Sequence, residues 1–187
     1  MDIFYALRVL QHRGQESAGI AVFNNGIKVI KGMGLAHQAL KNEDIRNLKG
    51  ERGIGHVRYS TFGSSTIENA QPIVVSTNYG DIALAHNGEI VNAGKIMDDL
   101  KKKGWAFITS SDSEIAVRLL ANDIANTGDP VKSLKNLMSI IQGSYSMTVM
   151  IDNRINTRMR SFRERRGTPS LCESSGRNSN SILFASG

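Results

Sequence analysis

The sequence has few of the residues that mark several classes of protein. Its single cysteine, Cys172, excludes an intramolecular disulfide framework and any metal site built from cysteines alone. No run of 18 apolar residues is present, so no segment is expected to span a membrane, and residues 1–5 lack the pattern of a signal peptide. A hydrophobic share of 40% in 187 residues is nevertheless enough for a packed domain. We therefore expect a cytoplasmic globular protein without a membrane partner.

The chain carries a formal net charge of +6, and this charge is unevenly distributed. Residues 154–187 contain seven arginines and two glutamates, which leaves residues 1–153 almost neutral. A basic balance suits a nucleic-acid partner, but the globular part does not carry it, so we do not expect nucleic acid as the partner. The division predicts a domain at residues 1–153 and an atypical arginine-rich segment at 154–187 with a terminal strand.

The hydrophobic pattern predicts a layered α+β domain. Its expected elements do not alternate regularly between strand and helix, which argues against a doubly wound parallel sheet. Past residue 155 the periodicity fades, and only residues 181–185 again resemble a strand. The expected elements are a helix at 3–10, hairpins at 20–31 and 73–85, strands at 54–60, 105–109 and 144–151, and helices that begin at Asn92, Ser111 and Asp129.

Polar segments at the ends of the expected strands predict a site. Arg58 offers a planar fork for a carboxylate, and Asp112 can pair with an ammonium group. Asn87 and the Gly88 N–H are two donors that could stabilise an oxyanion. Together they describe a site for an amino acid with a reacting carbonyl. Taken singly, Arg58 also fits a surface ion pair, Asp112 a helix cap, and Asn87-Gly88 a turn. The four histidines match no metal-binding pattern, so no metal is expected.

Five segments in the same order resemble the glutamine amidotransferase domain of the amidophosphoribosyltransferase family. They are Gln-His-Arg-Gly-Gln-Glu-Ser-Ala-Gly at 11–19, Gly-His-Val-Arg-Tyr-Ser-Thr at 55–61, Ala-Gln-Pro at 70–72, Leu-Ala-His-Asn-Gly at 84–88, and Ser-Asp-Ser-Glu at 111–114. The resemblance implies an N-terminal-nucleophile hydrolase fold, an αββα sandwich of two antiparallel sheets. It implies glutamine hydrolysis, with the ammonia used by a second domain to make phosphoribosylamine from phosphoribosyl pyrophosphate in purine synthesis.

The same resemblance implies roles for individual residues. These roles are α-carboxylate binding by Arg58, α-ammonium binding by Asp112, an oxyanion hole made by Asn87 and Gly88, a pocket wall at Thr61, and support of the nucleophile by Arg13. No cofactor is implied for this segment. Mg²⁺, an iron–sulfur cluster in some members, homo-oligomers and the phosphoribosyltransferase domain belong to intact enzymes of the family.

The sequence departs from the family at both ends. The family's nucleophile is an N-terminal cysteine, whereas this sequence begins Met1-Asp2, and we reject Cys172 as a substitute because it has no free α-amino group. We expect that the chain starts about twenty residues late, without the family's first strand, and does not hydrolyse glutamine as written. Residues 156–180 indicate a locally shifted reading frame, an error in the gene model, or real divergence. The alternatives are a non-catalytic glutamine-binding module, a truncated pseudo-enzyme, and a nucleic-acid binder that uses the arginine-rich segment.

Overall fold

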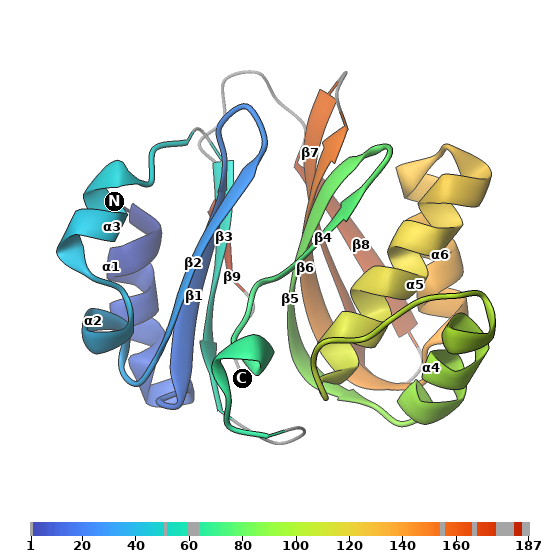
Figure 1. Cartoon of the computed structure of the whole chain (residues 1–187), viewed down its shortest axis with the longest axis horizontal. Helices are drawn as coiled ribbons and strands as arrows, with labels where there is room; N and C mark the ends of the chain where they lie inside the picture. The colour runs from blue at the N-terminus through green and yellow to red at the C-terminus, as the bar shows by residue number, and fades with distance from the viewer. Residues whose placement is uncertain are drawn as a thin grey trace.

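The computed structural model describes residues 2–50, 52–59, 64–153, 156–165, 168–174 and 182–184. These residues form four layers, in which two β-sheets face each other and helices cover their outer sides (Figure 1). This arrangement confirms the predicted α+β sandwich of the N-terminal-nucleophile hydrolase type.

The first sheet lies on the N-terminal side of the sandwich. Its β1–β2 and β1–β3 pairs are antiparallel, whereas β9 pairs in parallel with β3, so this sheet is not antiparallel throughout. Three helices and a short 3₁₀ turn lie on its outer side (Figure 1). The strands, in spatial order, are β2 (Ile27–Met33), β1 (Ser17–Phe23), β3 (Arg52–Arg58) and β9 (Ile182–Phe184). The helices are α1 (Asp2–Val9), η1 (Leu10–Arg13), α2 (Ala36–Ala39) and α3 (Asn42–Asn47).

The second sheet is antiparallel along its whole width. Three longer helices cover its outer face, and a 3₁₀ turn, η2 (Ile67–Asn69), lies in the connection that leads into it. The strands, in spatial order, are β4 (Ile73–Thr77), β5 (Gly80–Ile90), β6 (Gly143–Asn153), β7 (Asn156–Arg165) and β8 (Thr168–Ser174). The helices are α4 (Ala93–Lys102), α5 (Asp112–Thr127) and α6 (Pro130–Ile140).

The buried hydrophobic residues form three clusters, because alternate residues of each strand face opposite sides of its sheet. One cluster joins the first sheet to its helices, and a larger one joins the second sheet to α4, α5 and α6. The third lies between the sheets and consists mostly of small side chains, including Ala21, Ala83 and Ala85. Small residues on the facing strands let the two sheets approach closely. The polar ends of the same strands then lie near one another.

Most of the predicted elements are present in the structure. The first hairpin turns at Asn25 and Gly26, which both have positive φ angles, as an Asn-Gly turn requires. The helix predicted to begin after Asp129 is capped by that carboxylate, which accepts a hydrogen bond from Val131 N at 2.8 Å. The strand predicted at 181–185 is confirmed as β9.

Three details of the prediction are wrong. Residues 105–109 form no strand, because the N–H groups of Ile108 and Thr109 donate to the Glu114 carboxylate instead of to a neighbouring strand. Asn92 precedes α4, but its side chain bonds to Ile140 O and Gln142 N rather than capping that helix.

The third error concerns the segment after residue 155, where the apolar alternation fades. The chain there forms β7 and β8, which extend the second sheet by antiparallel pairing with β6 and with each other. A sheet edge offers backbone donors and acceptors whatever the side chains are, so strands can form there without an apolar pattern. The domain boundary placed at residue 153 stays a prediction.

No helix in the described ranges is long and apolar enough to cross a membrane.

Candidate functional site

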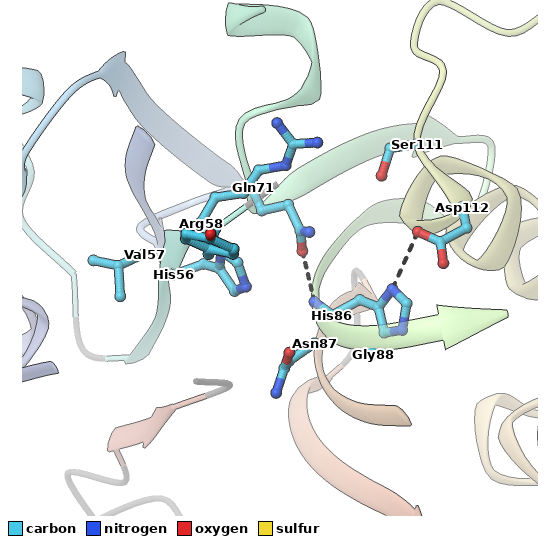
Figure 2. Close-up of a pocket in the computed structure, with 10 residues that line it drawn as sticks. His56, Val57, Arg58, Gln71, His86, Asn87, Gly88, Ser111 and Asp112 are labelled. Atoms are coloured by element: carbon cyan, nitrogen blue, oxygen red, sulfur yellow. Dashed lines mark hydrogen bonds and ion pairs between the residues drawn. The ribbon is translucent and has the colours of Figure 1, made fainter. Parts of the chain in front are cut away.

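A pocket opens where β3, β5 and the start of α5 meet (Figure 2). Its empty volume is about 370 Å³, part of which is open solvent. The residues that line it are His56, Val57, Arg58 and Tyr59 from β3 and the position after it, Gln71, then His86, Asn87 and Gly88 from β5, and Ser111 and Asp112.

Arg58, the last residue of β3, contributes a buried guanidinium group to this pocket. Only 4% of the residue is exposed, and its Nη1 donates to the Glu16 carboxylate and, at 3.3 Å, to the Ser64 carbonyl. The backbone ties the same two segments together, because Glu16 N donates to Arg58 O at 3.0 Å. The ion pair compensates the burial of the guanidinium charge and fixes its position.

Asp112 lies across the pocket from the β3 residues, at the first position of α5 (Figure 2). Its Oδ2 accepts a hydrogen bond from Ile90 N at 3.0 Å, and its Oδ1 lies 3.5 Å from His86 Nδ1. Burial acts to raise the pKa of the Asp112 carboxyl, but His86 and the N–H groups of Ile90 and Ser113 outweigh it and lower the pKa below its ordinary value. The carboxylate is therefore ionised at neutral pH.

The cap of α5 is supplied by Ser111, whose Oγ accepts from Ser113 N at 3.2 Å. The Ser-Asp-Ser-Glu sequence at 111–114 has the spacing of a capping box, but the box does not form, because the Glu114 carboxylate accepts from the N–H groups of Ile108 and Thr109 instead of from Ser111 N. Asp112 is thus not needed as the cap, and the helix-capping interpretation of this residue is replaced by a carboxylate that faces the pocket.

Asn87 and Gly88 lie side by side on β5, paired with Ser146 and Tyr145 of β6. Gly88 has a φ of 133°, and a Cβ at this position would lie 2.1 Å from the Ser144 carbonyl oxygen. Only glycine fits there without displacing the backbone of β6. The strand therefore brings an amide side chain and an adjacent N–H group to the same edge of the sheet.

The structure thus brings four of the six predicted site residues to one pocket: Arg58, Asn87, Gly88 and Asp112. Arg13 does not line it, and lies exposed at the end of η1. Thr61 lies outside the described residues. The roles assigned to these six residues stay predictions.

Two histidines that the prediction considered only as metal ligands also line the pocket. His56 is 4% exposed, and neither of its ring nitrogens has a hydrogen-bond partner. Burial, and to a smaller extent the His86 ring and the Arg58 guanidinium, lower the pKa of His56 from 6.5 to about 3, although the His86 main chain acts in the opposite direction. His56 is therefore a neutral group at pH 7.

His86 links the two sides of the site through its side chain and its backbone. Its Nδ1 lies 3.2 Å from Ser113 Oγ as well as near Asp112, and its backbone N–H donates to Gln71 Oε1 at 2.6 Å (Figure 2). The alternation of strand residues could have predicted part of this arrangement. His56 shares a strand face with Arg58, whereas His86 must point to the opposite face from Asn87, toward α5.

Comparison with known proteins gives one consistent result. A family model described as "Glutamine amidotransferase domain" matches residues 56–187. An amidophosphoribosyltransferase of Archaeoglobus fulgidus is 46% identical over 152 residues, which are 81% of this chain and 33% of that relative. Its counterpart from Methanocaldococcus jannaschii is 41% identical over 185 residues, 98% of this chain and 38% of the relative.

Solved structures agree with the sequence relatives. The glutamine phosphoribosylpyrophosphate amidotransferase from B. subtilis, complexed with ADP and GMP, superimposes with a TM-score of 0.73 and 37% identity over 84% of this chain and 33% of its own. A structure described as the allosteric regulatory enzyme of purine biosynthesis gives a TM-score of 0.76 and 35% identity over 88% of this chain and 35% of its own. The chain spans about a third of the length of the curated relatives that it matches.

Proposed function

Because the chain belongs to the family of glutamine amidotransferase domains, we propose that its pocket binds glutamine as the glutamine-hydrolysing part of an amidophosphoribosyltransferase. What supports the proposal is that Arg58 and Asp112, which come from opposite halves of the sandwich, line one pocket. A buried cation and a buried anion in one pocket match the opposite charges that an α-amino acid carries on a single carbon.

The chemistry of each group follows from its surroundings. The planar guanidinium of Arg58 can donate two parallel hydrogen bonds to the α-carboxylate, and the ionised Asp112 can accept from the α-ammonium. Asn87 Nδ2 and the Gly88 N–H would donate to the side-chain carbonyl oxygen, which becomes negatively charged when a nucleophile adds to the amide carbon. In the family reaction a thiol adds to that carbon, ammonia leaves, and water converts the glutamyl thioester to glutamate.

We further propose that a polypeptide of these 187 residues binds glutamine without hydrolysing it. Its one cysteine, Cys172, lies in β8, three strands away from β5, which carries Asn87 and Gly88. Through Ser161 and Thr148, the register of the sheet aligns Cys172 with Ala85. Three strand spacings are about 14 Å, so the backbone position of Cys172 is remote from an amide held at Asn87.

The parts outside this chain remain proposals as well. The ammonia would pass to a separate phosphoribosyltransferase domain that makes phosphoribosylamine for purine synthesis, in a cytoplasmic and homo-oligomeric enzyme. Within the ranges that the structure describes, no three His, Cys, Asp or Glu side chains gather as metal ligands. The proposal includes no cofactor for this domain, and assigns Mg²⁺ and any iron–sulfur cluster to the intact enzyme.

Titration calorimetry with the purified 187-residue chain tests this proposal. We expect L-glutamine to bind with a dissociation constant below about 1 mM. L-glutamate should also bind, because it carries the same α-carboxylate and α-ammonium groups. A coupled ammonia assay on the same sample should show no release above buffer.

Two results would contradict the proposal. Ammonia release that disappears in Cys172→Ala would overturn the claim of binding without hydrolysis. No heat with glutamine, together with DNA binding that weakens steeply with salt and is lost on deletion of residues 154–187, would favour the nucleic-acid alternative.

A further inference from the structure

One buried side chain, Asn69 at the end of η2, connects the two halves of the pocket without lining it. Only 1% of Asn69 is exposed. Its Nδ2 donates to the Ser64 carbonyl at 2.7 Å and lies 3.1 Å from Ser110 Oγ, and its Oδ1 accepts from Ser110 N at 3.2 Å. Both ends of this amide are therefore used, and together they join Ser64 to Ser110, 46 residues further along the chain.

Each of the two segments leads directly to a charged group of the pocket. The Ser64 carbonyl that accepts from Asn69 also accepts from Arg58 Nη1, at 3.3 Å. Ser110 stands two residues before Asp112, next to the cap of α5. One amide side chain thus lies in a continuous path of contacts from the guanidinium to the carboxylate.

No regular secondary structure fixes the position of Ser110. The residues before α5 form no strand, and side-chain hydrogen bonds hold them instead. Ser64 N also donates to Ser110 Oγ, at 3.2 Å, but that hydroxyl can rotate whereas the Asn69 amide is rigid and buried. Asn69 therefore supplies a connection between the Arg58 side and the Asp112 side of the pocket that no sheet pairing provides.

We infer that Asn69 is a positioning residue that fixes the spacing between Arg58 and Asp112, and thereby selects ligands that carry a carboxylate and an ammonium on one carbon. The inference rests on the proposed function, because it concerns the same pocket. A ligand with both groups gains from two charged partners held at a fixed separation, whereas a ligand with one group needs only one partner.

Two variants of the 187-residue chain separate positioning from simple stability. Asn69→Ala removes all the contacts of the amide, and Asn69→Asp keeps an acceptor for Ser110 N if the alanine variant does not fold. Asn136→Ala is the matched control, because Asn136 Nδ2 donates to Asp123 Oδ2 at 2.9 Å, and neither residue lines the pocket.

The ligands are L-glutamine, 5-amino-5-oxopentanoate, which lacks the ammonium, and 4-aminobutanamide, which lacks the carboxylate, all titrated by NMR. We expect Asn69→Ala to weaken glutamine binding about tenfold, the effect of one lost hydrogen-bonded contact, and each analogue less than about twofold. Equal weakening of all three ligands, an unchanged affinity for glutamine, or the same loss in Asn136→Ala would overturn the inference.

Hydrogen exchange without ligand distinguishes a failure of this inference from a failure of the proposed function. Ile90, whose backbone N–H donates to Asp112, is 21 residues away from Asn69 in the sequence. If Asn69 positions Asp112, exchange at Ile90 N accelerates at least about fivefold in Asn69→Ala and stays unchanged in Asn136→Ala. Unchanged exchange at Ile90 N overturns the inference whether or not glutamine binds.

Discussion

Replacing Arg58 with alanine is expected to weaken glutamine binding at least about 100-fold. The guanidinium is buried in the pocket wall and paired with Glu16, so the variant loses the proposed partner of the α-carboxylate and leaves the Glu16 carboxylate without its cation. Truncating one member of a buried charged pair costs about 3 kcal/mol, which corresponds to a loss of this size. Calorimetric titration of the variant with L-glutamine measures it.

Two further variants test whether this loss is specific to the pocket. Arg52→Ala removes an arginine from the opposite end of β3 and should leave glutamine affinity within about twofold of the unaltered chain. Arg58→Lys keeps the charge but loses the planar fork, and an intermediate loss of about tenfold is expected. Full glutamine affinity in a folded Arg58→Ala chain would remove Arg58 from the site.

Acidification from pH 7 to pH 5 is expected to lower the free energy of unfolding by about 2 kcal/mol through His56 alone. The pKa of His56 is lowered to about 3 in the folded chain, so the folded state takes up almost no proton at this position. The unfolded chain takes up a proton below its ordinary pKa of 6.5. The unfolded state therefore binds more protons in this range, and stability falls as the pH falls.

Urea denaturation of His56→Leu across the same pH range measures the effect. The substitution removes the titrating ring. Between pH 7 and pH 5 the free energy of unfolding should therefore fall by about 2 kcal/mol less than it does in the unaltered chain. His37→Leu, which replaces an exposed histidine in α2, is the matched control. An identical slope in His56→Leu and the unaltered chain would show that the pKa of His56 is not lowered in the folded state.

The sequence pattern predicts those elements whose stability depends on local signals. The Asn25-Gly26 turn and the Asp129 cap are determined by residues within a few positions, and both are present as expected. The strand predicted at 105–109 fails for the opposite reason. Its apolar residues resemble a strand, but its N–H groups bond to Glu114, which is a contact that no local pattern indicates.

The same division applies to the pocket. The residue types of Arg58, Asp112, Asn87 and Gly88 indicate their chemistry, and the resemblance to a known family indicates that they act together. The groups that support them depend on the fold. Glu16 pairs with Arg58 because β1 and β3 are neighbouring strands. Asn69 accepts a hydrogen bond from Ser110, which lies in a segment without helix or strand. The spacing of these residues in the sequence does not predict either contact.

A crystal structure of the 187-residue chain with bound L-glutamine tests the proposed glutamine site most directly. We expect the α-carboxylate within hydrogen-bond distance of the Arg58 guanidinium, the α-ammonium at Asp112, and the side-chain carbonyl oxygen at Asn87 and Gly88. Glutamine bound in the reverse orientation, or at a site that does not include Arg58 and Asp112, would contradict it.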